Sequence, residues 1–430
     1  MNKPSLITEL RERELLAQVS DAAALEEHLA AASRTVYCGF DPTADSLHIG
    51  SLVPLLTLRR FQRHGHRPIL LLGGATGMIG DPSGRLAERS LNSSEVVSGW
   101  VERIRAQVSG LVDLEGTQGG ANDAVIVNNL DWIQSLSAIA FLRDVGKHFS
   151  VNQMIQRESV RARLERDEEG ISYTEFSYML LQALDYAELA ERYDCSIQIG
   201  GSDQWGNIVS GMDLVRRKLG RESYALTVPL ITRSDGSKFG KTAAGTVWLD
   251  GARTSPYTFY QFWINTADAD AVRFLKIFTF LELAEIAEVA AEMAAAPESR
   301  AAQRRLAREV TAMVHGEAAV VSAERISRAL FDGAVAELAA ADLAQLAQDG
   351  MDCTSVSGAP VGLLAALADS GLARSRSEAR KLIAGGGVRV NGAVESDSER
   401  QLDWRDALHG RFYLLRKGKK HWHMLVREPD

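Results

Sequence analysis

The sequence predicts an α/β protein whose first domain holds a doubly wound parallel sheet, followed by an α-helical domain and a small α+β domain. Three observations predict this. In the first half of the chain, short apolar runs alternate with helical stretches, as in parallel strands joined by crossover helices. From about Ser255 to Asp332 the sequence is rich in Ala, Glu, Leu and Arg, with few strand signals. The last 70 residues form a separate basic segment.

Length, composition and cysteine spacing limit the classes of protein to which this chain can belong. A chain of 430 residues with a net charge of −8 is long enough for two or three domains and a large core. The three cysteines lie far apart in the sequence and have neither metal-ligand nor disulfide spacing, so we expect a reducing cytoplasm and no bound metal. The N-terminus is too charged for a signal peptide, and no apolar run approaches the ~20 residues that a membrane span needs.

Charge is unevenly distributed along the chain. Residues 360–430 contain 13 Lys and Arg against 9 Asp and Glu, a net charge of +4. The other 359 residues contain 35 and 47, a net charge of −12. A basic tail on an acidic body indicates that the tail contacts a polyanion.

The elements of the first domain can be assigned in order. Residues 1–33 are predicted to form an amphipathic helix. The strands are then predicted at 35–40, 68–73, 124–128, 195–200 and 226–231. Helical stretches between them predict a Rossmann-like sheet, in which ligands bind at the carboxyl ends of the strands. Four strands end in glycine or polar residues, in loops that begin at Gly39, Gly73, Asn128 and Gly200. We expect these four loops to form one site.

The motif His48-Ile49-Gly50 follows the first strand and a Pro-Thr-Ala turn, and it opens a helix. Unpaired N–H groups at the start of a helix bind anions well. Such a tripeptide is common and is weak evidence of function by itself. Its place between a strand and a helix, together with a second motif, favours phosphate binding.

The second motif is Gly-Ser-Lys-Phe-Gly-Lys-Thr at residues 236–242. It resembles a P-loop, but Asp235 occupies the position of the first glycine, and a loop and strand follow instead of a helix. We interpret residues 233–250 as a mobile loop whose Lys238 and Lys241 bring positive charge to a polyphosphate. A solvated basic loop is the alternative interpretation.

Tyr178, Gln182 and Asp185 have helical spacing and share one face, within roughly 60°, of a largely apolar helix. Buried polar groups must find partners. These three side chains therefore form either an internal hydrogen-bond network or a pocket for a polar small molecule. The glycine-rich stretch 73–84 lacks dinucleotide-binding spacing, and its Asp81 suits an ammonium group.

Taken together, these stretches resemble the bacterial tyrosyl-tRNA synthetases, a family of class I aminoacyl-tRNA synthetases, over essentially the whole chain. Residues 48–51 and 238–242 resemble the two signatures of the family. The stretches 37–43, 73–84, 178–185 and 201–205 match in order and spacing. Each motif is weak alone, whereas all of them in order are specific.

The resemblance implies a domain organisation. It comprises a Rossmann-like catalytic domain at 1–232, the lysine signature loop at 233–250, a helical anticodon-binding domain at 251–332, a linker at 333–359, and a small basic RNA-binding domain at 360–430.

The resemblance also implies roles for individual residues. Those for the substrate tyrosine are Tyr37 and Asp185 at the phenol, Asp81, Tyr178 and Gln182 at the ammonium, and Gln204 beside the carboxylate. Those for ATP are Cys38, Gly39, Asp41, His48, Gly50, Ser51, Gly201, Asp203, Gln204, Lys238 and Lys241. The catalytic residues are Thr43, His48, Lys238, Lys241 and Thr242, with Arg85 and Arg89 assisting at pyrophosphate or tRNA. Those for RNA are Arg374, Arg376, Arg380 and Lys381. Ser51 departs from the family pattern, which has histidine there.

The activity implied is tyrosine–tRNA ligation by a homodimer. ATP with Mg²⁺ activates L-tyrosine to tyrosyl-adenylate, and the tyrosyl group is then transferred to the 3′-terminal adenosine of tRNA(Tyr). Two alternatives stay open: an RNA-binding or splicing cofactor with a decayed synthetase core, and a related synthetase for another aromatic amino acid such as tryptophan. ATP–pyrophosphate exchange with tyrosine discriminates among them.

Overall fold

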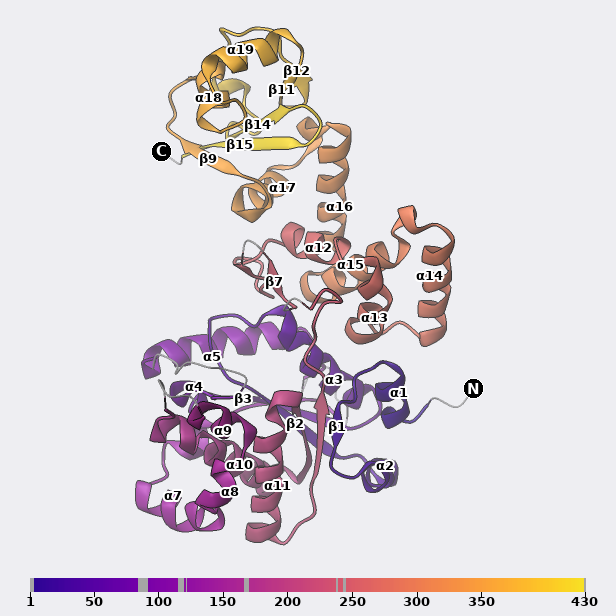
Figure 1. The fold of residues 1–430 in the computed structure, drawn as a ribbon, viewed down its shortest axis with the longest axis vertical. Coiled ribbons are helices and arrows are strands. Elements are labelled where there is room, and N and C mark those ends of the chain that lie inside the picture. The colour runs from indigo at the N-terminus through magenta and orange to yellow at the C-terminus, as the bar shows by residue number, and fades with distance from the viewer. Residues whose placement is uncertain are drawn as a thin grey trace. The chain divides into compact units, whose positions relative to one another are not determined.

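The computed structural model describes residues 4–83, 92–114, 120, 122–165, 170–236, 239–242 and 245–428 (Figure 1). These residues fall into two compact units. Unit 1 comprises residues 1–249 and 267–302, and unit 2 comprises residues 250–266 and 303–430. Among the described residues, no helix is both long enough and apolar enough to cross a membrane.

The described part of unit 1 contains a six-stranded sheet in the order β1-β6-β5-β2-β3-β4. The five strands from β6 to β4 are parallel, and β1 pairs antiparallel with β6. The strands are β1 Gln18–Val19, β2 Thr35–Phe40, β3 Arg67–Leu72, β4 Val125–Asn128, β5 Cys195–Gly201 and β6 Tyr224–Val228. The chain builds outward from β2 through β3 to β4 and then returns to the other side of β2, so the switch point lies between β2 and β5. Ligands bind at such a point, outside the carboxyl ends of the strands.

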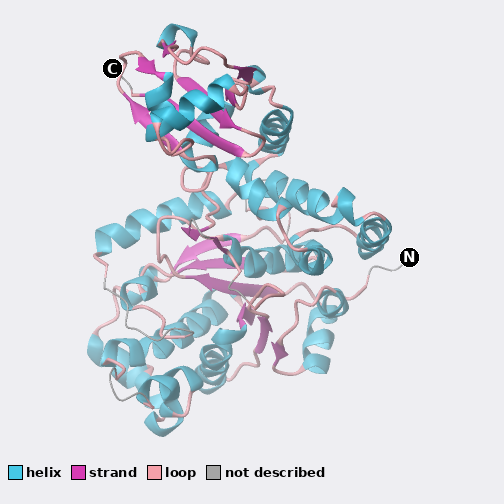
Figure 2. Ribbon diagram, turned by 45° about the horizontal axis from the view of Figure 1, so that its top comes forward, coloured by secondary structure: helices cyan, strands magenta, loops and turns pink. Residues whose placement is uncertain are grey.

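Helices cover both faces of this sheet (Figure 2). The helices of unit 1 are α1 Leu6–Glu12, α2 Ala22–Ala31, α3 Leu52–Arg63, α4 Thr76–Ile79, α5 Ser94–Val108, α6 Leu130–Ile133, α7 Ala138–Asp144, α8 Val151–Ile155, α9 Glu158–Leu164, α10 Tyr173–Tyr193, α11 Trp205–Leu219, α13 Asp268–Phe278 and α14 Leu283–Ala295, with short 3-10 turns η1 Ile49–Ser51, η2 Gly146–His148 and η3 Ser202–Gln204. A short hairpin pairs β7 Lys241–Thr242 with β8 Gly245–Thr246.

The long helix α10 has clear start and stop signals. The Ser172 side chain accepts a hydrogen bond from the Glu175 amide, which caps the first turn, and Asp194 ends the helix in a left-handed conformation. Most of the helix is buried, and Ala183, Tyr186 and Ala187 belong to one core with Tyr37 of β2. This packing fixes the polar face of α10 against the carboxyl end of β2.

Unit 2 consists of a helical part and a small α+β part. Its helices are α12 Pro256–Ile264, α15 Ala301–His315 (which begins at the boundary between the units), α16 Glu317–Asp332, α17 Ala340–Gln345, α18 Leu363–Asp369 and α19 Arg376–Ala384. Its 3-10 turns are η5 Val335–Glu337 and η7 Trp404–Asp406, and it has a π-helical turn η6 Leu346–Gly350. The 3-10 turn η4 Pro297–Ser299 belongs to unit 1. A five-stranded sheet has the order β12-β11-β14-β15-β9. The strands of unit 2 are β9 Cys353–Val356, β10 Val361–Gly362, β11 Val388–Val390, β12 Ala393–Val394, β13 Gln401–Leu402, β14 Phe412–Lys417 and β15 His421–Arg427. This part has its own apolar core, centred on α18, α19 and β14.

The predicted fold class is confirmed, and the five predicted strands all form, with ends within three residues of those expected. The single helix predicted for residues 1–33 is wrong. The chain turns at Glu14, whose φ of 60° is left-handed, and Asp21 caps a second helix, so α1 and α2 are separated by the edge strand β1. The turn at Glu14 and the cap at Asp21 therefore divide into two helices a stretch whose amphipathic pattern alone predicts one.

The segment 333–359, which we expected to be a linker, forms regular structure instead. It contains α17 and strand β9, and β9 pairs in parallel with β15. Leu343 and Leu346 are fully buried, which anchors the segment to unit 2. Helices α13 and α14, at residues 268–295, belong to unit 1.

Candidate active site

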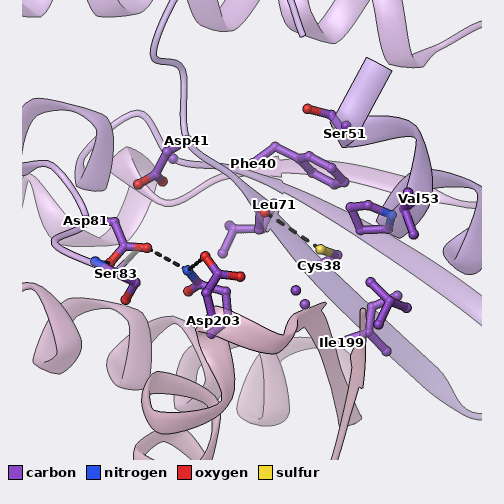
Figure 3. Close-up of a pocket in the computed structure, with 18 of the residues that line it drawn as sticks. Cys38, Phe40, Asp41, Ser51, Val53, Leu71, Asp81, Ser83, Ile199 and Asp203 are labelled. Atoms are coloured by element: carbon purple, nitrogen blue, oxygen red, sulfur yellow. Dashed lines mark hydrogen bonds between the residues drawn. The ribbon is translucent and has the colours of Figure 1, made fainter. Parts of the chain in front are cut away.

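A cavity of about 500 Å³ lies at the carboxyl ends of β2 and β5 (Figure 3). Fifteen residues predicted for the site line it: Tyr37, Cys38, Gly39, Asp41, Thr43, His48, Gly50, Ser51, Asp81, Tyr178, Gln182, Asp185, Gly201, Asp203 and Gln204. Figure 3 shows the carboxylates of Asp41, Asp81 and Asp203 on one side and Cys38, Val53 and Ile199 on the other. Three of the four loops expected to form one site, those after β2, β3 and β5, therefore contribute to this cavity.

Tyr37 and Asp185 are two deeply buried polar side chains of the cavity wall. The Tyr37 side chain is 0% exposed, and no described protein group hydrogen-bonds to its buried hydroxyl. Burial raises the pKa of Tyr37 well above its usual value, with a further contribution from Asp185, so the hydroxyl keeps its proton. Asp185 is 2% exposed. Together the two side chains offer a hydroxyl and a carboxyl group to a polar ligand.

Asp185 is held by two donors that follow β4, one at the start of helix α6 and one on it. Asn129 Nδ2 donates to Asp185 Oδ2 at 3.0 Å, and Trp132 Nε1 donates to Oδ1 at 2.9 Å. Burial raises the pKa of the Asp185 carboxyl to about 8, and the two donors offset part of that rise. Because each oxygen already accepts one bond, the carboxyl group is fixed in orientation and still has free lone pairs.

A second set of polar contacts surrounds Asp41 and Tyr178. The Tyr178 hydroxyl donates to Asp41 Oδ2 at 2.6 Å, and Thr76 Oγ1 donates to Asp41 Oδ1 at 2.6 Å. Asn129 Nδ2 donates in turn to Thr76 Oγ1 at 2.9 Å. Asp41, which we expected beside ATP, therefore has both oxygens engaged with residues on the α10 side of the cavity.

Asp81, Gln182 and Gln204 are joined by amide contacts. Gln204 Nε2 donates to Asp81 Oδ2 at 2.7 Å, and the Ser83 amide donates to Asp81 Oδ1 at 2.9 Å. Asn207 Nδ2 donates to Gln182 Oε1 at 3.0 Å. These bonds leave acceptor oxygens of Asp81 and Gln182 available to a cation.

His48 caps the turn η1 that leads into α3. Its Nδ1 accepts a hydrogen bond from the Gly50 amide at 3.0 Å. In the neutral ring the proton is therefore assigned to Nε2, which becomes the donor. The His48 side chain is exposed at the cavity mouth, where Thr43 is also exposed.

The expected lysine signature is described in part. Lys238 lies outside the described residues, as do Arg85 and Arg89. The backbone of Lys241 and Thr242 forms β7. Phe239 stacks on Phe278 at 5.1 Å between ring centroids and meets Phe274 edge-on at 5.2 Å. The Ser234 amide and hydroxyl donate to the buried Asp270 carboxylate. Helix α13 therefore contacts Ser234, which precedes the signature, and Phe239, which lies within it.

The four basic residues expected to contact RNA are all exposed. Arg376, Arg380 and Lys381 lie on α19, and Arg374 precedes it. At ~100° per residue, Lys381 points about 100° round the helix from Arg380, so the four do not share a single narrow face. Arg380 also pairs with Glu399 at 3.2 Å.

Sequence reasoning missed several residues that support the site. Asn129, Trp132, Thr76 and Asn207 hold the predicted side chains in place. For Asn129 and Trp132, the available signal in the sequence was the polar end of the strand at Asn128. Among the described residues, no cluster of three or more His, Cys, Asp or Glu side chains is arranged to hold a metal ion.

Comparison with known proteins gives the family. Residues 30–332 match the family model for class I tRNA synthetases (W and Y), and residues 342–425 match the model for the C-terminal domain of tyrosine–tRNA ligases. The tyrosine–tRNA ligase of Dechloromonas aromatica is 53% identical over 425 residues, covering 99% of each chain. That of Erwinia tasmaniensis is 55% identical over 427 residues, also covering 99% of each chain.

This chain belongs to the tyrosine–tRNA ligase family. This membership confirms the tyrosine–tRNA ligase activity that the sequence predicts. The two relatives are both tyrosine enzymes, which disfavours the alternative of a tryptophan enzyme. A solved structure agrees: a C-terminally truncated mitochondrial tyrosyl-tRNA synthetase from Aspergillus nidulans is 31% identical, with a TM-score of 0.69, covering 76% of this chain and 95% of that chain.

Proposed function

We propose that this tyrosine–tRNA ligase activates L-tyrosine with Mg-ATP to tyrosyl-adenylate and pyrophosphate, and then transfers the tyrosyl group to the 3′-terminal adenosine of tRNA(Tyr). One observation carries the substrate assignment. Tyr37 and Asp185 place a buried hydroxyl and a buried carboxyl group on the wall of a cavity that also presents Asp81. Those groups complement the phenol and the ammonium of tyrosine.

The phenol hydroxyl of the substrate donates to Asp185 and accepts from the Tyr37 hydroxyl in this proposal. Phenylalanine fits the same space but leaves both groups buried without a ligand partner. A buried polar group left unpaired costs ~1–3 kcal/mol, which applies to the Tyr37 hydroxyl, whereas Asp185 loses a ligand contact and keeps its bonds to Asn129 and Trp132. These lost contacts are the basis of discrimination. Tryptophan has no hydroxyl at the equivalent place.

The ammonium group lies against Asp81, Gln182 and Tyr178. Tyr178 donates its proton to Asp41, so its oxygen is free to accept from the ammonium. Gln182 is likewise oriented with its oxygen as the acceptor, because Asn207 donates to that oxygen. These hydrogen bonds therefore leave oxygen atoms of Asp81, Gln182 and Tyr178 as acceptors for the ammonium group.

In the first step a carboxylate oxygen of tyrosine attacks the α-phosphorus of ATP, the bond from phosphorus to the bridging oxygen breaks, and pyrophosphate leaves. The carboxylate is ionised at neutral pH and needs no general base. The protein contributes by positioning the two substrates and by stabilising charge on the phosphates. His48 and Thr43, with Lys238, Lys241 and Thr242, supply donors to the phosphates, while Mg²⁺ arrives with ATP as part of the substrate.

In the second step the ribose hydroxyl at the 3′ end of tRNA attacks the carbonyl carbon of tyrosyl-adenylate, and AMP leaves. Asp203 and Gly201 lie in the cavity where the adenylate ribose is proposed to bind. Exposed basic residues of the C-terminal part, including Arg374 and Arg376, contact tRNA phosphates.

We also propose that the enzyme is a homodimer. Among the described residues between 138 and 173, unit 1 exposes six large apolar side chains, and exposed apolar patches of this kind mark interfaces. They are Ile139, Leu142, Val151, Ile155, Leu164 and Tyr173. The double substitution Ile139→Asp and Val151→Asp is expected to yield a monomer in analytical ultracentrifugation, and an unchanged dimer would contradict the proposal.

Two assays test the proposed function. ATP–pyrophosphate exchange is expected to depend on tyrosine and to be negligible with tryptophan, and charging of tRNA(Tyr) is expected to follow. Absence of tyrosine-dependent exchange, or stronger exchange with tryptophan, would overturn it.

A further inference from the structure

Residues 45–48 lie between the end of β2 and the turn η1, and this segment brings His48 to the cavity wall. Ser46 and Leu47 are buried, at 4% and 6% exposed. Buried backbone groups must be paired, so groups from other elements must hold this segment in place.

One side of the segment is held by Gln107 on α5. Gln107 Oε1 accepts from the Leu47 amide at 2.9 Å, and Gln107 Nε2 donates to Ser46 Oγ at 3.0 Å. Ser46 Oγ donates onward to the Leu47 carbonyl at 2.8 Å. A single amide side chain therefore fixes the two residues that precede His48.

The other side is held by the strand-like segment 247–249, downstream of the lysine signature. The Leu249 amide donates to the Leu47 carbonyl at 2.9 Å, and the Ile49 amide donates to the Val247 carbonyl at 3.1 Å. His48 and Trp248 form an isolated antiparallel bridge, with their rings 6.5 Å apart. The segment is therefore hydrogen-bonded to α5 on one side and to residues 247–249 on the other.

We propose that Gln107 is a positioning residue for adenylate formation, acting through His48. Gln107 does not line the cavity, and its side chain hydrogen-bonds to Ser46 and Leu47, the two residues that precede His48. If the buried Leu47 amide loses this acceptor, the segment must shift to pair it again. A shift of about 1 Å in a positioned group can cost on the order of a hundredfold in rate.

The inference rests on the proposed function and makes a prediction specific to one step. The β- and γ-phosphates leave as pyrophosphate in the first step, so donors at the His48 position act in that step only. Loss of Gln107 should therefore slow adenylate formation and spare both tyrosine binding and transfer to tRNA. General destabilisation would lower the active fraction and would not separate the two steps.

The test uses the full chain and single-turnover kinetics, with active sites titrated for each variant. Gln107→Leu is expected to slow adenylate formation about tenfold, with the Kd for tyrosine and the transfer rate within twofold of wild type. Gln107→Glu keeps an acceptor for the Leu47 amide and is expected to recover part of that loss. Glu102→Gln, at an exposed position on the same helix, is the matched control and should leave every rate unchanged.

A double-mutant cycle with His48→Ala separates a positioning role from a general one. In the His48→Ala background, Gln107→Leu is expected to slow adenylate formation by less than twofold. A full tenfold loss in that background, equal slowing of the transfer step, or a wild-type rate for Gln107→Leu would each overturn the inference. Wild-type exchange with tyrosine is measured alongside, so that failure of the proposed function is seen separately.

Discussion

Replacing Tyr37 with phenylalanine should have opposite effects on stability and on substrate binding. The change removes one oxygen atom and no other part of the ring. In the ligand-free protein that hydroxyl is buried, and none of the described protein groups pairs with it. The ring itself packs edge-on against Tyr186 at 5.2 Å between centroids, and phenylalanine keeps that contact.

The magnitudes follow from these contacts. A buried polar group without a protein partner costs ~1–3 kcal/mol, so its removal should leave the free energy of unfolding unchanged or raise it by up to about 1 kcal/mol. In the proposed complex with tyrosine, the same hydroxyl donates to the phenol oxygen of the substrate. Loss of that neutral hydrogen bond costs ~0.5–1.5 kcal/mol, which corresponds to a tyrosine KM raised roughly two- to twelvefold.

Urea unfolding and pyrophosphate exchange measure the two effects. The kcat/KM for phenylalanine is the internal control, and it should not fall in Tyr37→Phe, because phenylalanine makes no bond to the missing hydroxyl. A less stable variant with an unchanged KM for tyrosine would refute the reasoning.

Three further predictions concern other parts of the site. Burial raises the pKa of Asp185 to about 8, so below that pH the carboxyl group must lose its proton before the phenol can donate to it. The KM for tyrosine in exchange assays should therefore fall as the pH rises from 6 to 8. This pH dependence should vanish in Asp185→Asn, and it should also vanish when phenylalanine is the substrate. Asp270→Ala removes the acceptor that lies 3.1 Å from the Ser234 amide. It should slow adenylate formation about tenfold with little change in the KM for tyrosine, and Lys241→Ala should have the same effect. Single-turnover rates near wild type would argue against this. Deletion of residues 351–430 removes a part with its own core, and it should preserve exchange while strongly reducing tRNA charging, so full charging by the truncated chain would contradict the RNA-binding role.

Elements with strong local signals were predictable from sequence. The run at Thr35–Phe40 is apolar, β-branched and aromatic, and the strand forms at the residues expected. Strand ends rich in glycine located the cavity, because parallel strands bring their carboxyl ends to one edge of the sheet. The spacing of Tyr178, Gln182 and Asp185 was sufficient to place them on one face of α10.

Features that depend on distant contacts could not be predicted in this way. Strand β9 forms because β15, some 70 residues later, offers an edge, and a short polar sequence gives no sign of that pairing. Gln107 and Asn129 look like ordinary polar residues until the fold places them beside Leu47 and Asp185. The same is true of α13, whose aromatic side chains meet Phe239 only in the folded chain.

The ratio of kcat/KM for tyrosine to that for phenylalanine, measured by pyrophosphate exchange, tests most directly the claim that Tyr37 and Asp185 read a phenol hydroxyl. Tyrosyl-tRNA synthetases are known to reject phenylalanine by ~10⁵ without editing, a magnitude taken from that family and not worked out from this structure. We predict a ratio of this order for the wild type, reduced at least tenfold in Asp185→Asn. A wild-type ratio near one, or an unchanged ratio in the variant, would contradict the account.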